Sequence, residues 1–279
     1  MNVARSGPPA PGAVKQITSL ANPIVKEIRG LALAKNRKAS GLFLAEGLKL
    51  VADAVEAGWR IRTLVHATGV GGQPLIARLA AGTHARGGGV IAVSEAVLAK
   101  ISRRDNPQTV LGVFEQRLTK AAAIRPAGDA PWIALEAVRD PGNLGTIVRT
   151  ADAVGAGGVI LVGDTVDPFS VEAVRATMGS VFAVPLAKVS HADFAAIARR
   201  WPGTIVGTHL AATVDYRAAE YRSPVLLVMG GEQAGLTAET AALCRTLVRI
   251  PMAGKADSLN LAVATAVMLY EVRRGSLKL

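Results

Sequence analysis

A glycine turn in the second half of the chain carries three residues that could bind a ligand or take part in catalysis. Residues 140–164 read DPGNLGTIVRTADAVGAGGVILVGD and contain Asn143, Gly145 and Arg149 close together. An apolar run, a glycine turn, a helical stretch, a second apolar run and Asp164 follow one another, as in a dinucleotide-binding unit. The first question is therefore whether this turn binds the phosphates of a nucleotide.

The spacing of the glycines argues against a dinucleotide site and thus against a nicotinamide enzyme. The Rossmann fingerprint needs three glycines as G-x-G-x-x-G, so that the backbone can approach a pyrophosphate at a helix N-terminus. This turn has only Gly142 and Gly145, and no lysine follows them as in a Walker loop. The glycine-rich first motif of the common doubly wound methyltransferases is missing too. Taken alone, the turn also fits a purely structural interpretation, in which Asn143 is a helix N-cap and Arg149 a surface residue.

Two further glycine loops follow apolar runs in the same half of the chain. Residues 225–237, VLLVMGGEQAGLT, predict a buried strand that runs into a glycine loop. Residues 249–267, RIPMAGKADSLNLAVATAV, predict a strand, a loop and a long helix with Asp257 or Ser258 as its N-cap. Glycine loops at the carboxyl ends of strands let backbone N–H and C=O groups face a ligand directly. Two such loops suit a purine base and a ribose better than a phosphate.

Length and composition limit the class of protein. The chain has 279 residues, half of them apolar, which is enough for two domains with a substantial core. No uninterrupted apolar run reaches the roughly 18 residues of a membrane span and the start lacks a hydrophobic signal segment, so we expect a soluble, cytoplasmic protein. Four scattered histidines and one cysteine give no metal-ligand spacing. Cys244 lies in an apolar helical stretch, which predicts a buried, unreactive thiol.

The net charge of +11 is concentrated in the first half of the chain. Residues 1–129 hold 18 Lys+Arg against 8 Asp+Glu, a net of +10, whereas residues 130–279 hold 14 against 13, a net of +1. Such a field attracts polyanions, and its natural partner is nucleic acid. A solvated basic surface that aids solubility is the simpler alternative.

Apolar and helical stretches alternate along the chain, which predicts two α/β domains. We expect a disordered tail at residues 1–15, a smaller domain at 16–118, a linker at 119–130 and a second domain at 131–279. Residues 22–38 predict a helix with Ile24, Val25, Ile28 and Leu31 on one face. In the second domain, apolar runs predict strands at 132–138, 158–163, 181–186, 204–210, 225–230 and 246–252.

Together the three glycine-containing stretches resemble the motifs of the SpoU, or TrmH-type, RNA ribose methyltransferases of the SPOUT superfamily. The motifs occur in the family's order as NLGTIVR, GGEQAGL and IPMAGKADSLN, and the resemblance continues between them in VDPFSVEAVRATMGSVFAVPL. The stretch ITSLANPIVKEIRGLALAKNRKASGLFLAEGLKLV resembles the RNA-binding domain, similar to ribosomal protein L30e, that precedes the catalytic domain in many members. The departures, Gly231 before Glu232 and LNLAVA where LNVSVA is common, replace no functional side chain.

The resemblance implies a fold, a cofactor and an oligomeric state. It implies a C-terminal SPOUT domain with a deep trefoil knot, preceded by a smaller L30e-like α/β domain. General topology rules argue against knots, and periodicity alone predicts an ordinary open sheet. The resemblance also implies that S-adenosylmethionine binds in the knot in bent form, that RNA is the substrate and that the protein is a homodimer through its C-terminal domain. The cofactor-binding residues implied by motif position are Gly230, Ile250, Met252, Leu259 and Asn260.

The implied reaction is in-line transfer of a methyl group from a sulfonium to a ribose 2′-hydroxyl, and it needs a hydroxyl that is oriented and deprotonated. Arg149 corresponds to the family's catalytic arginine, often described as a general base. A guanidinium with a pKa above about 12 scarcely releases its proton, so a charged Arg149 that binds the target phosphate and stabilises the alkoxide fits its chemistry better. The full set of implied catalytic residues is Arg149, Asn143, Asn260, Ser258 and Glu232.

The basic first domain is expected to bind the phosphates of the RNA. The densest cluster of cations is Arg29, Lys35, Arg37 and Lys38, although a solvated helix end, where cations suit the helix dipole, would give the same pattern. The predicted target is 23S ribosomal RNA. A transfer RNA target, an antibiotic-resistance methyltransferase of ribosomal RNA and a non-catalytic ribosome-assembly factor are the alternatives, and the intact motif side chains argue against the last.

Overall fold

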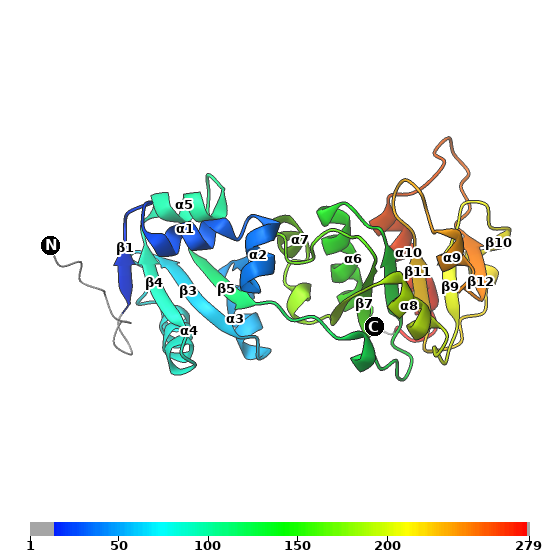
Figure 1. Ribbon diagram of the computed structural model, residues 1–279, viewed down its shortest axis with the longest axis horizontal. Coiled ribbons are helices and arrows are strands. Elements are labelled where there is room, and N and C mark those ends of the chain that lie inside the picture. The colour runs from blue at the N-terminus through cyan, green and yellow to red at the C-terminus, as the bar shows by residue number, and fades with distance from the viewer. Residues whose placement is uncertain (1–13, 278–279) are drawn as a thin grey trace. The chain divides into compact units, whose positions relative to one another are not determined.

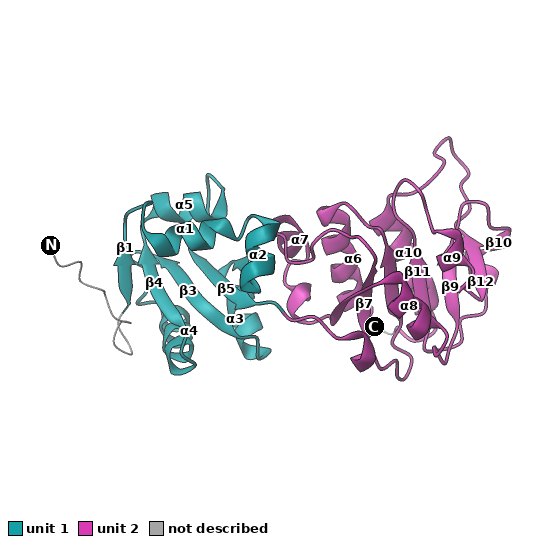
Figure 2. Cartoon of the chain, in the orientation of Figure 1, with its two compact units in different colours: residues 1–116 teal, residues 117–279 magenta. Residues whose placement is uncertain are grey.

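The computed structural model describes residues 14–277 and divides into two compact units, residues 1–116 and 117–279 (Figures 1 and 2). Residues 1–13 of the expected tail lie outside the described residues. The tail was expected to extend to residue 15, but a strand, β1 (Lys15–Ile17), already begins there and pairs with the sheet of unit 1. Each unit is an α/β layer structure, so the predicted fold class is confirmed.

Unit 1 is a five-stranded sheet in the order β1-β4-β3-β5-β2. Strands β1, β4 and β3 are parallel, whereas β5 runs antiparallel to both β3 and β2. Figure 1 shows α1 and α5 on one face of this sheet and α3 and α4 on the other. The elements after β1 are α1 (Pro23–Gly30), α2 (Ala34–Ser40), β2 (Leu42–Glu46), α3 (Leu48–Glu56), β3 (Ile61–Ala67), α4 (Pro74–Ala85), β4 (Gly89–Val93), α5 (Glu95–Ser102) and β5 (Val110–Glu115).

The helix expected at residues 22–38 is two helices, α1 and α2, with a break after Gly30. Asn22 caps α1 by accepting a hydrogen bond from the Ile24 N–H at 3.0 Å. The predicted apolar face is confirmed, because Val25 and its neighbours on that face pack into the core of unit 1. The break was not predicted, since apolar periodicity continues through it while the backbone turns.

Unit 2 is a seven-stranded parallel sheet in the order β10-β12-β9-β11-β6-β7-β8. Every residue of β6, β7 and β11 is buried, as expected for parallel strands covered on both faces. The elements are η1 (Ala121–Ala123), β6 (Trp132–Glu136), α6 (Pro141–Ala153), β7 (Gly158–Val162), α7 (Val171–Ala176), η2 (Ser180–Phe182), β8 (Leu186–Val189), α8 (His191–Ala198), β9 (Ile205–Thr208), β10 (Val214–Asp215), η3 (Tyr216–Ala218), β11 (Leu226–Met229), α9 (Ala238–Ala241), β12 (Thr246–Arg249) and α10 (Leu261–Val272).

Five of the six strands predicted in unit 2 are strands in the structure, but the one at 181–186 is wrong. Residues 180–182 form the short helix η2, and β8 begins only after Pro185. Val181, Phe182, Val184 and Leu186 are buried and fill the core from an irregular segment, whereas Ala183 and Pro185 are exposed. A short apolar run does not distinguish a strand from any other buried segment.

Residues 119–130, expected to form a linker, are packed against the second sheet. The Thr119 N–H donates to the Leu186 carbonyl at 2.7 Å. Ile124 is buried in the same hydrophobic core as Trp132 and Trp201. The sequence of this segment shows no apolar periodicity because its residues pack individually, and its one regular element is the three-residue helix η1.

Within residues 14–277, no helix combines the length and the apolar character that a membrane crossing requires. The deep trefoil knot stays a prediction, because the order and direction of strands do not determine whether a segment passes through a loop.

Gly145 determines how closely α6 approaches α7. A Cβ atom at this position would overlap the Ala176 side chain and lie 2.6 Å from the Ala173 carbonyl oxygen. Only a residue without a side chain therefore permits this contact between the two helices. The contact matters for the site because α6 contains the first motif, residues 143–149. Gly145 acts through packing rather than through a ligand.

Replacement of Gly145 tests this packing. We expect Gly145→Ala to lower the free energy of unfolding by about 1–3 kcal/mol, because a buried Cβ would force α6 and α7 apart. Urea unfolding monitored by circular dichroism measures the effect. Gly275→Ala is the control, since its Cβ would meet open space and should change stability by no more than about 0.5 kcal/mol. Equal stability of the two variants would contradict the packing role.

Candidate functional site

The sheet of unit 2 reverses its direction of growth between β6 and β11. From β6 the chain adds β7 and then β8 on one side, whereas β11, β9 and β12 lie on the other side. In open parallel sheets, the carboxyl ends of strands at such a reversal border a crevice that the connecting loops line. The first and second motifs follow β6 and β11, so their loops meet at this reversal.

A pocket of about 600 Å³ opens at this edge, a size that suits a small-molecule ligand. It is lined by the loops that follow β9, β11 and β12 and by the first turn of α10. The structure thus brings together residues of the second and third motifs, although α9 and β12 lie between these motifs in the sequence. The predicted site residues in its lining are Gly230, Glu232, Ile250, Met252, Ser258, Leu259 and Asn260.

A chain of side-chain hydrogen bonds links all three motifs at this pocket. The Asn143 Nδ2 donates to Glu232 Oε1 at 3.0 Å, and the Asn260 Nδ2 donates to Asn143 Oδ1 at 2.9 Å. Asn143 therefore has both ends of its amide fixed by residues far away in sequence. We call Asn143, Glu232 and Asn260 the polar relay.

The two helix ends beside the relay differ from the expected caps. Asp140, rather than Asn143, is the N-cap of α6, because its carboxylate accepts from the Asn143 N–H at 2.6 Å. The N-cap of α10 is Asn260, which accepts from the Ala262 N–H at 2.9 Å, and not Asp257 or Ser258. The structural interpretation of Asn143 is thus wrong, and its side chain is free to join the relay.

The loop after β11 brings backbone atoms very close together. A Cβ at Gly230 would overlap the backbone of Gly235 and Leu236, so only glycine fits there. The Gly235 N–H donates to the Gly231 carbonyl at 3.0 Å and closes the loop. Three of the residues that line the pocket here, Gly230, Gly231 and Gly235, have no side chain, so a ligand can approach their peptide groups closely.

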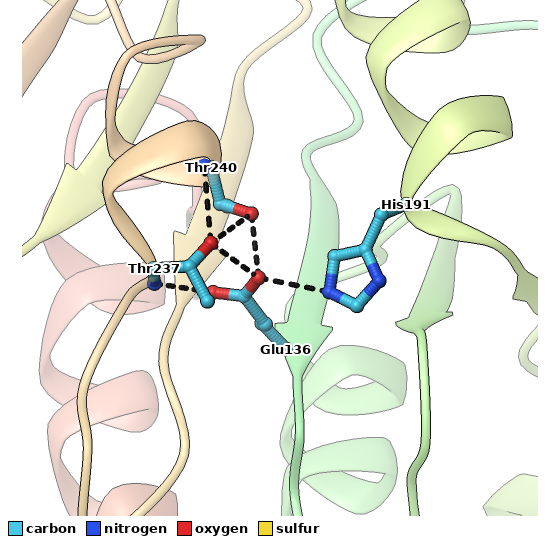
Figure 3. Close-up of polar contacts among 4 residues, drawn as sticks. All are labelled: Glu136, His191, Thr237 and Thr240. Carbon is cyan, nitrogen blue, oxygen red and sulfur yellow. Dashed lines mark hydrogen bonds and ion pairs between the residues drawn. The ribbon is translucent and has the colours of Figure 1, made fainter.

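A buried carboxylate lies behind this loop (Figure 3). Glu136, the last residue of β6, is 1% exposed and accepts hydrogen bonds from Thr237, Thr240 and His191. Burial raises the pKa of Glu136, but the hydrogen bonds from Thr240 and Thr237 and the charge interaction with His191 together bring it below its ordinary value. Glu136 is therefore ionised at neutral pH.

Comparison with known proteins identifies the two units. Residues 131–270 match the SpoU rRNA Methylase family, and residues 22–112 match an MRM3-like substrate binding domain. The chain is 32% identical over 98% of its length to the 23S rRNA (uridine(2479)-2'-O)-methyltransferase of Streptomyces viridochromogenes and covers 96% of that protein. It is 29% identical over 93% of its length to the 23S rRNA (guanosine(2553)-2'-O)-methyltransferase RlmP of Bacillus subtilis and covers 100% of it.

A solved structure is similar over nearly the whole chain. The crystal structure of an AdoMet-bound rRNA methyltransferase from Sinorhizobium meliloti has 55% sequence identity and a TM-score of 0.90, and the match covers 95% of this chain and 99% of that chain. The chain belongs to the SpoU rRNA methylase family. The predicted resemblance, enzyme class and cofactor are confirmed: the protein is a methyltransferase that uses S-adenosylmethionine.

The pocket suits the cofactor of a SpoU methylase. An adenosine needs donors and acceptors at short range, and the peptide-lined wall around Gly230 provides them. The apolar side chains of Met252 and Leu259 line the same cavity as the polar relay residues Glu232 and Asn260. The cavity therefore offers both kinds of surface that the cofactor's adenosine and methionine parts require.

Arg149 does not lie in the pocket of its own chain. It is exposed on α6, six residues or about 9 Å along the helix axis beyond Asn143, and it is not among the residues that line the cavity. Within residues 14–277 its guanidinium makes no hydrogen bond or ion pair. The structure thus joins Asn143 to the other motifs but leaves Arg149 open to solvent.

Sequence motifs missed the part of the pocket that follows β9. Thr208, His209 and Leu210 line the cavity, as does Arg249 at the end of β12. A signal was present, since polar residues directly after a buried strand lie at the edge where such sites form. The run TIVGTHL predicts a strand, and its polar end belongs to none of the three motifs.

The prediction that Arg37 binds RNA is wrong. Its side chain is 3% exposed and its Nη1 donates to the carbonyls of Leu31, at 2.7 Å, and Ala32, at 3.0 Å. These carbonyls lie just beyond α1, where a helix leaves acceptors without partners, so Arg37 joins α2 to the end of α1. The other three cations predicted with it, Arg29, Lys35 and Lys38, are exposed.

Cys244 has the properties expected of an unreactive thiol. It is half-buried beside β9, and its Sγ lies 3.6 Å from the Thr240 carbonyl oxygen. Burial raises the pKa of the thiol to about 12, and the negative charge of Glu136 contributes to the rise. Since the thiolate is the nucleophilic form, this residue is unsuited to covalent catalysis at neutral pH.

Alkylation measures this directly, because Cys244 is the one cysteine of the chain. We expect iodoacetamide to modify the native protein at pH 8 at least about a hundredfold more slowly than the protein in 6 M guanidinium chloride, where the thiol regains a pKa near 8.5. N-acetylcysteine in the same two buffers corrects for solvent effects. Similar rates in the two states would show that the thiol is neither shielded nor raised in pKa.

Proposed function

We propose that the protein transfers a methyl group from S-adenosylmethionine to a ribose 2′-hydroxyl of 23S ribosomal RNA. The observation that carries this proposal is the polar relay, since it joins the three motif loops at one pocket. The names of the two curated relatives, which are matched along nearly their whole lengths, support the choice of RNA and of the 2′-oxygen. The cytoplasmic location expected from the sequence stays a prediction.

The polar relay is suited to orient a ribose. When bound, the cofactor supplies a methyl group on a positively charged sulfur. Glu232 is exposed, so its carboxylate can accept a hydrogen bond from an incoming hydroxyl. Asn143 donates to that carboxylate, and Asn260 in turn donates to Asn143 and holds its amide in place. A hydroxyl held in one orientation avoids much of the entropic cost of the transfer.

Arg149 is proposed to bind the phosphate next to the target ribose and to stabilise the alkoxide that develops there. The planar fork of a guanidinium matches the oxygens of a phosphate, and the solvent-exposed position of Arg149 suits a group that meets an incoming polyanion. A general-base role is not proposed, because a guanidinium does not release its proton readily.

A homodimer through α10 is proposed as the form that completes the site. Val263 and Tyr270, seven residues apart on α10, are 49% and 53% exposed. Exposed apolar side chains at this spacing form one stripe on a helix, and such stripes are typical of contacts between helices. Because α10 packs against α6, a dimer through this face would place Arg149 beside the interface.

The first unit is proposed to bind the RNA backbone with a corrected set of residues. Arg29 on α1 borders a hollow whose other cations are Lys100, Arg103 and Arg104, at the end of α5. All four are exposed. Several cations around one hollow neutralise successive phosphates, whereas the buried Arg37 cannot.

Arg149 variants test the proposed reaction in cells. Ribose 2′-O-methylation is mapped across ribosomal RNA from cells with the wild-type gene, without it, and with Arg149→Ala. We expect one position in 23S RNA to lose its methyl group in the deletion strain and to stay unmethylated with Arg149→Ala, while purified Arg149→Ala binds S-adenosylmethionine with a Kd close to wild type. Loss of one charge-stabilising group should slow transfer by about a hundredfold or more.

The control for this experiment is Arg200→Ala. Arg200 is an exposed arginine of the same unit, and its Nε donates to the Ala196 carbonyl of the preceding helical turn at 3.0 Å. This variant should restore methylation fully. Unchanged methylation of 23S RNA in the deletion strain would contradict the proposed substrate, and near-normal turnover by Arg149→Ala would contradict the proposed role of that residue.

Salt dependence tests the basic hollow. We expect Lys100→Ala and Arg103→Ala together to weaken RNA binding and to reduce the slope of log K against log salt by about 0.7–0.9 for each phosphate that the protein no longer neutralises. Filter binding of a 23S RNA fragment between 50 and 300 mM KCl measures both quantities. Arg78→Ala is the matched control, because Arg78 lies on α4 and pairs with Glu56 at 2.9 Å. An unchanged slope in the double variant would place the phosphates elsewhere.

A further inference from the structure

The buried carboxylate of Glu136 has partners on two separate elements of unit 2. Thr237 donates to Glu136 twice, from its N–H to Oε2 at 2.8 Å and from its hydroxyl to Oε1 at 2.9 Å. The Thr240 hydroxyl donates to Oε1 at 2.6 Å, and His191 Nε2 lies 3.1 Å from the same oxygen (Figure 3). A buried charge is tolerated only when its lone pairs are this well bonded, so these contacts are a fixed part of the fold.

The side of β6 on which Glu136 lies explains these partners. Side chains alternate along a strand, so Glu136 points to the same face as Trp132 and Ala134. Those two residues belong to the hydrophobic core that α8 and the start of α9 cover. Glu136 is the polar end of that row, and it meets the threonines at the start of α9 instead of an apolar side chain.

The contacts fix the far end of the loop that forms one wall of the pocket. Residues 230–235 line the cavity, and Thr237 follows them closely as the N-cap of α9. At the near end, β11 pairs with β6 through Met229 and Leu135. The loop is thus held at one end by the sheet and at the other by Glu136.

The middle of the loop also lies against the end of β6. A Cβ at Gly231 would lie 2.9 Å from the Ala137 carbonyl oxygen, so the loop backbone passes directly over the residue after Glu136. Any shift of Thr237 would therefore move peptide groups that face the cavity. Glu136 itself is not among the residues that line the pocket.

We propose that Glu136 is a positioning residue for methyl-donor binding, which holds the 230–237 loop in its cofactor-binding conformation through Thr237 and Thr240. It acts without contact with the donor or the RNA. The inference rests on the proposed placement of S-adenosylmethionine in this pocket. It predicts a specific division of effects: removal of these hydrogen bonds weakens donor binding, while the chemical step, which depends on other residues, is preserved once donor is saturating.

Three substitutions remove the hydrogen bonds to different degrees. Thr240→Val removes one hydroxyl donor and keeps the shape of the side chain, so we expect the Kd for S-adenosylmethionine to rise about threefold to tenfold. Glu136→Met removes every acceptor and should raise the Kd for S-adenosylmethionine by more than about tenfold. Glu136→Gln should lie between wild type and Glu136→Met, because its amide can still accept from the Thr237 N–H and donate to the hydroxyls.

Calorimetric titration with S-adenosylmethionine measures binding to the full-length protein, and initial rates on 23S RNA separate KM for the donor from kcat. Hydrogen exchange without donor follows the amides of residues 230–240, which should lose protection in Glu136→Met and Thr240→Val. Thr177→Val is the matched control: Thr177 is equally buried and its hydroxyl donates to the Val174 carbonyl of α7 at 2.7 Å. It should leave the Kd and the exchange of this loop unchanged, whatever it costs in Tm.

The outcomes separate a positioning role from a merely structural one. A rise in Kd and KM with kcat within about twofold of wild type supports the proposal. An unchanged Kd in folded Thr240→Val and Glu136→Met overturns it, and so does a fall in kcat with KM unchanged. If the wild-type protein itself binds no S-adenosylmethionine, the proposed site is wrong and the inference falls with it.

Discussion

The parallel pairing of β6 with β11 is the constraint on which the site depends. Their register sets Leu135 beside Met229, so the two strands end at the same edge of the sheet. One strand then leads into the first motif and the other into the second, and the relay residues Asn143 and Glu232 meet there from 89 positions apart. A one-residue slip in this register would move the Asn143 amide away from Glu232 and would point the Glu136 carboxylate to the opposite face of the sheet.

Glycine makes the convergence of these loops possible, for a different reason at each position. At Gly145 a side chain would collide with α7, so its absence sets a helix–helix distance. At Gly230 a side chain would collide with the loop's own backbone, so its absence sets the shape of a pocket wall. Both residues belong to recognisable motifs, yet neither needs to touch a ligand to be indispensable. The two glycines permit close approach of the backbone, and the side chains of Glu232 and Asn260 line the pocket that results.

Motif order was enough to predict the family and which loops of the second unit come together, and the alternation of apolar and helical stretches predicted two α/β domains. Local contacts were harder to predict. Arg37 and Lys38 are adjacent cations, but only Arg37 lies within reach of the free carbonyls after α1, and that depends on a break in the helix that apolar periodicity does not signal. Asp140 and Asn143 are both good caps, and the backbone geometry decides between them. Glu136 carries no motif signal at all, because its importance comes from a threonine 101 positions later.

The two units differ in net charge, and this difference bears on the binding of a cationic methyl donor. A strongly basic catalytic unit would attract RNA, but its field would also oppose the binding of a sulfonium cation. Unit 1, residues 1–116, holds 15 Lys+Arg against 7 Asp+Glu, a net of +8, whereas unit 2, residues 117–279, holds 17 against 14, a net of +3. In unit 2 the carboxylate of Glu232 lines the pocket and that of Glu136 lies behind the loop that forms its wall. Arg149 is exposed on α6 outside the pocket, whereas Arg249 lies in the pocket lining together with Glu232 and Asp257. Two carboxylates in the same lining offset the charge of the Arg249 guanidinium, so the pocket can still favour a sulfonium ligand. The field that a cationic donor meets is therefore set by the balance of these three side chains rather than by the exclusion of cations from the pocket.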